Sequence, residues 1–272
     1  METISILGCG WLGLPLAEHL VNSGYKVKGS TRTKKDIPFL ESKGIEPSLL
    51  VLDPEIHGSN LNNFFDGDIL IINFPPERRE DIVKYHERQA VSLIETIKLS
   101  SIKKVVFASS TSVYPDLNRE VTEDEMLEPS KPSGKALLQF ESLLSSRTEF
   151  KTTVLIFAGL IGYDRKPGRF LAGKKEVMNG QAPVNLIHQD DCVNIIHQII
   201  QKNMWGETFN ACADLHPTRK EYYIHAANRL GLTPPTFVET NDLSYKIVGN
   251  EKLKKKLNYI YKYPDPFEID KD

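Results

Sequence analysis

The chain has 272 residues, of which 40% are hydrophobic, which suits one large α/β domain or a nucleotide-binding domain with a smaller lobe. The 34 Lys and Arg residues against 36 Asp and Glu leave a formal charge of -2, which excludes the basic field of a nucleic-acid-binding protein. No apolar run approaches the ~20 residues needed to cross a bilayer, and the chain passes from Met1 straight into a strand, so we expect a cytoplasmic protein without a membrane partner. Isolated cysteines (Cys9, Cys192, Cys212) indicate buried thiols and no metal site.

The first predicted element is a strand that ends in a glycine-rich turn. The apolar run Ile4–Leu7 enters a G-x-G-x-x-G motif, and a helix is predicted over Leu14–Ser23. The first glycine permits a tight turn, the second lets backbone approach a pyrophosphate, and the third lets the helix pack against the sheet. The helix N-terminus attracts the phosphates. The motif therefore predicts a dinucleotide site, with contacts from Gly8, Gly10, Trp11, Leu12 and Gly13.

The end of the second predicted strand, Tyr25–Gly29, bears on which dinucleotide binds. An acidic side chain here would hold the ribose of NAD, whereas this chain continues with Ser30, Thr31 and Arg32. Hydroxyls and a guanidinium can donate to a 2′-phosphate, so these residues favour NADP over NAD. The alternative is that Arg32 and Lys34 only begin a solvated loop.

Strands and helices then alternate as in a doubly wound parallel sheet. Short, continuous apolar runs are typical of strands covered on both faces, and they occur at Ser48–Leu52, Asp68–Asn73, Lys103–Ala108 and Thr152–Phe157. Helices are predicted over Arg78–Leu99 and Ser133–Ser145. The predicted fold class is α/β, a Rossmann doubly wound parallel sheet with a small C-terminal substrate lobe, in which residues 1–157 form the NAD(P)-binding core and 158–272 are mostly the lobe.

Glycines and prolines interrupt the chain after Phe157. A strand-like Val184–Ile187, a helix over Asp190–Lys202 and a strand over Glu207–Ala211 follow, and we expect about 185–211 to return to the Rossmann sheet. Within the remaining lobe, the cluster Lys252–Lys256 indicates the solvated face of a short helix.

Four blocks of the chain resemble the extended short-chain dehydrogenase/reductase superfamily, of the NAD-dependent epimerase/dehydratase type. They are the glycine motif, VVFASSTSVY at 105–114, NLIHQDD at 185–191, and the terminal stretch from Lys252-Leu253 to Pro264-Asp265-Pro266. The combination of GCGWLGLPLA, SSTSVYPD, AGLIG with KPGRFLAGK, and VNLIH is similar to the atypical, YeeZ-like branch. The resemblance implies a bound NAD(P), an oxidoreductase or epimerase-type activity, and a polar small-molecule substrate such as a nucleotide sugar.

Further cofactor contacts follow from the resemblance. A segment after the fourth strand lies along the adenosine ribose and pyrophosphate in the family, and the end of the sixth strand lies near the nicotinamide. Asp53 matches an acidic residue that contacts adenine, although a turn before Pro54 explains it equally well. The implied contacts are Asp53, Asn73, Phe74, Pro75, Ser109, Phe157 and Gly159.

The resemblance also implies a catalytic Ser or Thr after the fifth strand and a Tyr-x-x-x-Lys pair on the next helix. Ser110 matches the first of these. Gly134 and Glu141 align with a glycine and a glutamate of the family pattern. This alignment places Ser133 where the tyrosine belongs and Leu137 where the lysine belongs, so the usual pair is expected to be missing.

Tyr114 and His188 are the remaining candidates for acid–base catalysis. Tyr114 matches a family tyrosine that packs beneath the site. A lone histidine such as His188, next to the helix-capping residues Asp190 and Asp191, is more often a structural donor than an acid or base.

Thr111, Arg169 and Lys174 are the predicted substrate-binding residues. The two cations can grip an anionic substrate, or they are solvated loop charge. Three functions stay open: an NADP-dependent oxidoreductase or epimerase-type enzyme, a non-catalytic NAD(P)-binding sensor or regulatory protein, and a lyase that uses the cofactor as a scaffold. Relatives dimerise through two helices, which implies a homodimer through about Arg78–Leu99 and Ser133–Ser145.

Overall fold

The computed structural model describes residues 1–239 and 242–269, which divide into two compact units. The first unit comprises Met1–Val113, Pro129–Ile156 and Ile196–Thr208. The second comprises Tyr114–Glu128, Phe157–Ile195 and the chain from Phe209 onward. The last three residues of the predicted 158–272 segment lie outside the described part of the chain.

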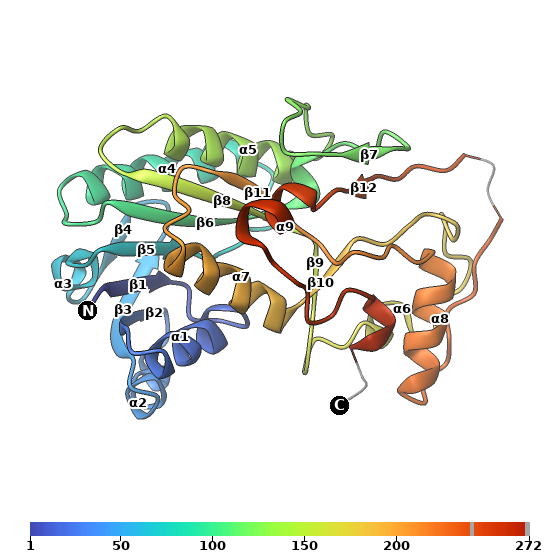
Figure 1. Cartoon of the computed structure of the whole chain (residues 1–272), viewed down its shortest axis with the longest axis horizontal. Coiled ribbons are helices and arrows are strands. Elements are labelled where there is room, and N and C mark those ends of the chain that lie inside the picture. The colour runs from blue at the N-terminus through green and yellow to red at the C-terminus, as the bar shows by residue number, and fades with distance from the viewer. Residues whose placement is uncertain (240–241, 270–272) are drawn as a thin grey trace. The chain divides into compact units, whose positions relative to one another are not determined.

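The main β-sheet confirms the predicted fold class (Figure 1). Within the described residues it has eight strands in the order β11-β8-β6-β5-β1-β2-β3-β4. Their bounds are β1 Thr3–Leu7, β2 Lys26–Thr31, β3 Glu46–Leu52, β4 Ile56–Gly58, β5 Ile69–Ile72, β6 Lys104–Ser110, β8 Lys151–Phe157 and β11 Thr208–Ala211. The pairs β1–β2, β1–β5, β2–β3 and β5–β6 are parallel, and β4 is antiparallel to β3. The strand order reverses between β1 and β5, which is where ligands of such sheets bind.

The central strands are buried because helices cover both faces of the sheet. Every residue of β5, Ile69–Ile72, has no exposed surface, and Val105–Phe107 of β6 are equally buried. Continuous burial of this kind explains why these strands read as unbroken apolar runs. The ring of Phe107 stacks on that of Phe140, with centroids 4.7 Å apart and an interplanar angle of 5°.

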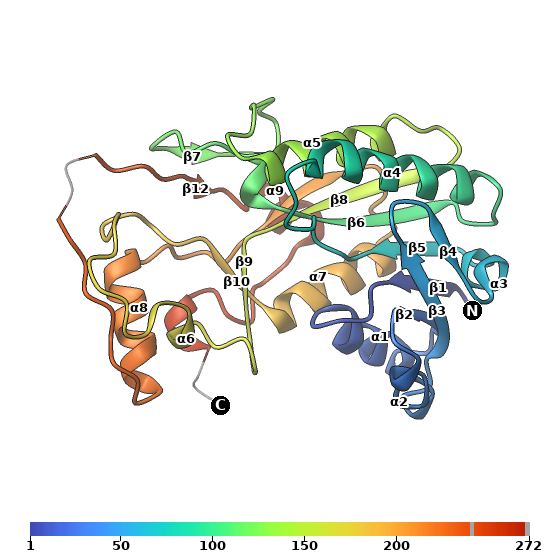
Figure 2. The ribbon, with the colours of Figure 1, turned by 180° about the vertical axis from the view of Figure 1, so that it is seen from behind.

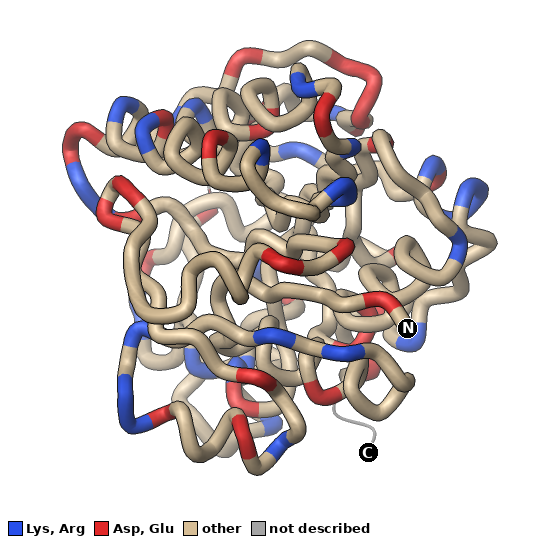
Figure 3. The backbone as a smooth tube through the Cα atoms, turned by 90° about the vertical axis from the view of Figure 1, so that its left-hand side faces the viewer, with Lys and Arg blue, Asp and Glu red and all other residues tan. Residues whose placement is uncertain are grey.

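Figures 1 and 2 show which helices cover each face. Helices α4 (Ile82–Lys98) and α5 (Pro132–Ser145) lie side by side on one face. Helix α1 (Gly13–Asn22) and the second half of α7 (Gln189–Gln201) lie on the other. His19 on α1 and His197 on α7 join them through a 2.7 Å contact between Nε2 and Nδ1. Cations and anions are interspersed along the chain (Figure 3).

Short elements connect the strands where no element was predicted. They are η1 (Lys34–Asp36), α2 (Ile37–Ser42), α3 (Leu61–Phe65) and η2 (Thr111–Val113). A buried ammonium fixes α3: Lys28 of β2 donates from Nζ to the carbonyl oxygens of Asn63 (2.5 Å) and Asp66 (2.6 Å). Carbonyls at a helix end thus provide the partners that a buried lysine requires.

The second unit is built from short elements. Strand β7 (Glu120–Val121) pairs with β12 (Ile247–Val248), and β9 (Gly159–Ile161) pairs with β10 (Leu186–His188) in separate two-stranded sheets. The segment that begins near residue 185 therefore first pairs with β9 and joins the main sheet only at β11. The helices are α6 (Gly168–Leu171), α8 (Arg219–Arg229), α9 (Glu251–Leu257) and η3 (Pro266–Glu268). Helix α9 confirms the short helix expected for the Lys252–Lys256 cluster.

Among the described residues, no helix is both long and apolar enough to span a membrane. The three cysteines are free thiols, and the described residues contain no cluster of side chains suited to hold a metal ion.

Candidate functional site

The turn between β1 and α1 is closely packed around two of its glycines. Gly8 has a φ of +106°, and a Cβ on it would lie 2.3 Å from the carbonyl oxygen of Asn73. A Cβ on Gly13 would lie 2.1 Å from the carbonyl oxygen of Gly8. Neither position accepts a side chain without movement of backbone. Asn73 also donates from Nδ2 to the Gly8 carbonyl at 3.2 Å, which holds the turn against the end of β5.

Gly10 differs from its two neighbours in the motif, because a Cβ on it would meet no atom within 4 Å. Helix α1 begins at Gly13, at the end of the same turn, and no described side chain caps its N-terminus. Free amides and the positive end of the helix dipole attract an anion. The cradle therefore fits the pyrophosphate of a dinucleotide, with Trp11 and Leu12 as part of the same turn.

The loop after β2 holds the residues predicted to distinguish the cofactors. The Ser30 hydroxyl accepts a hydrogen bond from the Gly8 amide at 2.8 Å, so it braces the glycine turn. The Thr31 hydroxyl donates to a carboxylate oxygen of Asp36 at 3.2 Å. Arg32 is exposed and makes no hydrogen bond or ion pair with other described residues. The sequence analysis missed Asp36, because it comes five positions after Thr31 and reaches it only through the turn of η1.

Asp53, predicted to contact adenine, is exposed and holds a tyrosine of α4. Its carboxylate accepts a hydrogen bond from the Tyr85 hydroxyl at 2.7 Å. The pKa of Tyr85 is raised to about 12, mainly by burial and secondly by this hydrogen bond. The Arg79 guanidinium covers the tyrosine ring at 3.6 Å from its centroid. The Asp53 amide also bonds the Glu55 carbonyl, as in a turn.

The loop after β5 is anchored by an aromatic side chain. Phe74 contacts the rings of His86 and Phe140 edge-on, with centroids 5.6 and 6.0 Å away. Asn73 is half-buried against the glycine turn, and Pro75 is exposed. This anchoring fixes the loop beside the cradle.

At the end of β6, two adjacent serines have different partners. Ser109 is buried and donates its hydroxyl to the carboxylate of Glu141 on α5. Burial raises the pKa of Glu141 to about 7. Ser110 is half-buried, and its hydroxyl accepts a 3.3 Å hydrogen bond from the Ser112 amide. Thr111 follows it as the first residue of η2 and is half-buried. The Ser109–Glu141 contact joins residues far apart in sequence and was not predicted.

Helix α5 packs its first turn against η2. A Cβ on Gly134 would lie 2.1 Å from the Ser112 carbonyl oxygen, so the two backbones touch. This contact places Ser133 close to the chain that follows Ser110. One turn further along, Leu137 is buried with 2% of its surface exposed, while Lys135 is exposed.

In the second unit, Tyr114 is buried and its hydroxyl donates to Asn210 Oδ1 at 2.9 Å. Asn210 in turn donates to the Gly249 carbonyl, so the phenol belongs to a buried polar network. Phe157 is buried at the end of β8, and Gly159 begins β9 with its amide bonded to the Asn185 carbonyl.

His188 ends β10 and lies between two aromatic rings. Its ring centroid is 4.0 Å from that of Tyr263 and 5.3 Å from that of Tyr163. Its Nδ1 accepts a hydrogen bond from the Asp190 amide at 3.2 Å, which places the proton of the neutral ring on Nε2. The carboxylate of Asp191 is fully buried, and the backbone amides of residues 262 and 263 and the Tyr259 hydroxyl donate to it.

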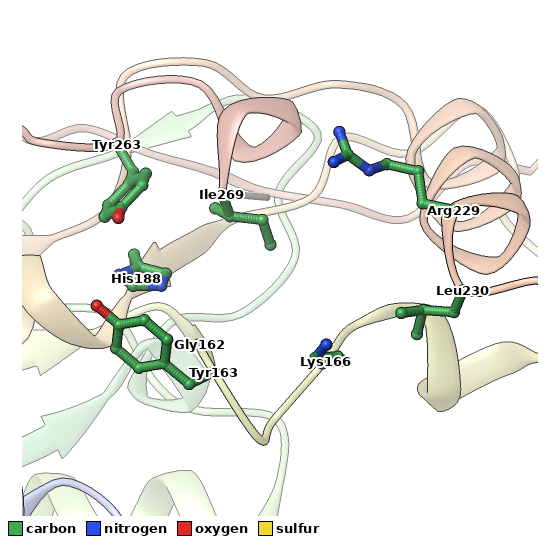
Figure 4. Close-up of a pocket in the computed structure, with 8 residues that line it drawn as sticks. All are labelled: Gly162, Tyr163, Lys166, His188, Arg229, Leu230, Tyr263 and Ile269. Atoms are coloured by element: carbon green, nitrogen blue, oxygen red, sulfur yellow. The ribbon is translucent and has the colours of Figure 1, made fainter. Parts of the chain in front are cut away.

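A cavity of about 310 Å³ lies next to His188 in the second unit (Figure 4). Its lining residues are Gly162, Tyr163, Lys166, His188, Arg229, Leu230, Tyr263 and Ile269. The predicted substrate residues Arg169 and Lys174 are exposed and do not line it. Arg229 and Tyr263 were missed because they come from α8 and the C-terminal segment, which carry no local motif.

Comparisons with known proteins agree with this architecture. Residues 4–212 match the model of the NAD dependent epimerase/dehydratase family. Protein YeeZ of Escherichia coli (strain K12) is 34% identical over 269 residues, which cover 98% of each chain.

Solved structures of this fold include UDP-N-acetylglucosamine 4-epimerase from Bacillus cereus, with a TM-score of 0.77 and 18% identity over 98% of this chain and 97% of that one. MoeE5 in complex with UDP-glucuronic acid and NAD gives a TM-score of 0.79 and 17% identity over 99% and 97%. The full-length similarity, the family match and the glycine cradle lead to one conclusion: this chain belongs to the NAD dependent epimerase/dehydratase family.

Proposed function

We propose that the protein is an NADP-dependent oxidoreductase or epimerase-type enzyme that acts on a polar substrate, with a nucleotide sugar as the leading class. The observation that carries the proposal is the cradle at Gly8, Gly10 and Gly13, in which two positions are closed to side chains and the middle one is open beside uncapped amides. A dinucleotide pyrophosphate matches this arrangement in charge and in the space it leaves.

In this proposal the cofactor is held mainly by the loops at the carboxyl ends of the strands. The pyrophosphate is held by the turn 8–13, and the 2′-phosphate by Arg32 with Thr31. When bound, the nicotinamide of such a cofactor accepts or supplies a hydride. The other proposed contacts are Asp53, Asn73, Phe74, Pro75, Ser109, Phe157 and Gly159.

The substrate class rests on proteins of the same fold. MoeE5 is described with UDP-glucuronic acid and NAD, and UDP-glucose 4-epimerase from Thermotoga maritima with UDP-glucose. We transfer the nucleotide-sugar class to this chain as part of the proposal. NADP is retained over NAD because Arg32 offers an unengaged guanidinium at the end of β2.

The catalytic groups we propose are Ser110 and His188. Ser110 would orient a substrate oxygen through its half-buried hydroxyl, and the Nε2–H of the neutral His188 would donate a hydrogen bond that polarises it. Tyr114 is the weaker candidate of the original three, because its hydroxyl is already committed to Asn210. Ser133 and Leu137 stand in the proposed alignment where the usual tyrosine and lysine belong.

One observation favours a second function, a non-catalytic NADP-binding sensor. Leu137 is packed in the interior of the first unit, so this position supplies neither a charge nor a hydrogen bond to a cofactor ribose. In this chain the cradle is kept, while the position where the family has its lysine faces the core. This combination fits a protein that binds the cofactor and senses its redox state without catalysing hydride transfer.

Turnover separates the two functions. We expect the enzyme to turn over at least one member of a panel of carbonyl compounds and nucleotide sugars. Carbonyl reduction is measured by the loss of NADPH absorbance, and epimerisation, which has no net effect on the cofactor, by NMR of the sugar product. The double variant Ser110→Ala, His188→Gln should lower kcat by about 100-fold, since each group orients or polarises the reacting oxygen. Tyr114→Phe is the matched control and should change kcat by less than about 3-fold.

Unchanged turnover in the double variant would refute the proposed mechanism. No turnover across the panel, together with a difference in protease resistance between the NADP-bound and NADPH-bound protein, would establish the sensor instead.

The cofactor assignment has its own test in Arg32→Ala. Loss of a charge-assisted contact should weaken NADP binding by about 10-fold and leave NAD binding within about 2-fold. Titration calorimetry with both dinucleotides measures the difference, and Lys35→Ala, another exposed cation three residues away, is the control. Equal weakening of NAD and NADP would rule out a 2′-phosphate role for Arg32.

A further inference from the structure

The cavity beside His188 has two chemically different ends (Figure 4). One end is aromatic, because Tyr163, His188 and Tyr263 stand together there. At the other end, Lys166 and Arg229 approach from different segments of the chain, the loop before α6 and the last turn of α8.

The charge of the lining is positive. The described residues of the lining include two cations, Lys166 and Arg229, and no carboxylate. Lys166 is half-buried, and its ammonium makes no hydrogen bond or ion pair with another described residue. A half-buried ammonium without a protein partner is costly unless an anion or water compensates it.

The nearby carboxylate of Asp190 does not offset this charge, because it is already engaged. Lys262 donates to it from Nζ at 2.7 Å, and the Tyr163 hydroxyl lies 2.9 Å from the same oxygen. The Tyr163 bond also turns the tyrosine ring edge toward His188. The Asp190 carboxylate thus serves to fix Tyr163 in the wall of the cavity.

We propose that this cavity binds a small ring compound that carries a phosphate monoester. A phosphate gains from a guanidinium fork and an ammonium together, while aromatic side chains pack against the face of a sugar or base ring. A volume of about 310 Å³ is at the small end of ligand pockets, which favours a sugar phosphate or nucleoside monophosphate. The site lies wholly within the second unit and does not depend on the proposed cofactor.

Titration calorimetry on the full-length protein tests the site, with glucose 1-phosphate and AMP as probes and with glucose and adenosine as controls that lack the phosphate. We expect at least one phosphorylated probe to bind with a Kd below about 1 mM and its unphosphorylated counterpart to bind at least 10-fold more weakly. Lys166→Gln and Arg229→Gln should each weaken the bound probe by about 10-fold.

Lys175→Gln and Lys220→Gln are matched controls, since they remove exposed cations that do not line the cavity. Both should leave probe binding within about 2-fold of the wild type. Arg229→Lys keeps the charge and should retain more affinity than Arg229→Gln, which covers the case in which the glutamine variant is poorly folded.

An independent readout is the NMR signal of the His188 ring, which should shift when the probe binds. No binding of either phosphorylated probe by the wild type would overturn the proposal. So would an equal loss of affinity in all four glutamine variants, which would indicate diffuse charge attraction. Failure of NADP binding with the probe still bound would refute the proposed function and leave this site standing.

Discussion

Gly10→Ala is expected to yield a stably folded protein that binds NADP about 100-fold more weakly than the wild type, a loss of about 2.7 kcal/mol. The fold tolerates the methyl group because a Cβ at Gly10 meets no atom within 4 Å. The cofactor does not tolerate it, because the open space at this position is where the turn would approach the pyrophosphate. Thermal unfolding should change little, while calorimetry with NADP should show the loss.

Gly13→Ala is the informative contrast within the same motif. Its Cβ would lie 2.1 Å from the Gly8 carbonyl oxygen, so the turn or α1 must move. We expect this variant to lose about 1–3 kcal/mol of unfolding free energy as well as cofactor affinity. If Gly10→Ala lost as much stability as Gly13→Ala, or if it bound NADP normally, the open position would have no role in binding.

The second large effect concerns the pH dependence of stability through Glu141. Burial raises the pKa of this carboxyl from 4.5 to about 7, so the folded protein retains a proton that the unfolded chain releases. Its contribution to stability is therefore fully present below pH 4.5 and declines as the pH rises toward 7. A shift of this size corresponds to about 3 kcal/mol.

Glu141→Gln keeps an acceptor for the Ser109 hydroxyl and cannot ionise. Relative to the wild type, we expect it to become more stable as the pH rises, by about 2.5 kcal/mol between pH 5 and pH 8. Urea unfolding at several pH values measures the difference. Burial lowers the pKa values of His86 and His197 and gives the opposite trend in acid, but both histidines are present in both proteins and cancel.

Glu87→Gln is the control, because Glu87 lies on α4 and its carboxylate has no hydrogen bond or ion pair to other described residues. Its stability relative to the wild type should stay constant across this pH range. A Glu141→Gln difference that is equally constant would show that Glu141 is ionised in the folded protein at neutral pH.

The sheet could be predicted from sequence because each central strand is an unbroken apolar run. Residues 69–72 and 105–107 carry this signal, and their complete burial explains it. Some element boundaries differ from those predicted. The helix expected to begin at Arg78 begins at Ile82, after the residues in which Arg79 forms an ion pair with Asp81. The elements η1, α2, α3 and β4 have three to six residues each, too few for a periodic pattern to develop.

The glycine turn of the candidate site was also predictable, because its requirements are local. Partnerships across the chain were not. The contact of Ser109 with Glu141 spans 32 positions, and the bond between Asp53 and Tyr85 also spans 32. No spacing rule encodes such pairs, and the same holds for Lys166 and Arg229 around the cavity. These pairs depend on how the helices pack on the sheet, which local sequence patterns do not predict.

The burial of Leu137 has a consequence for attempts to engineer the protein. Changing Ser133 to Tyr and Leu137 to Lys would restore the residue types of the usual catalytic pair. The new lysine side chain, however, would replace a leucine of which only 2% is exposed. A lysine there must either lose its charge or pull the first turns of α5 away from η2, where Gly134 already touches the Ser112 carbonyl. Recovering the usual chemistry would thus require α5 to pack differently against η2 and the sheet. These two substitutions alone do not supply that change.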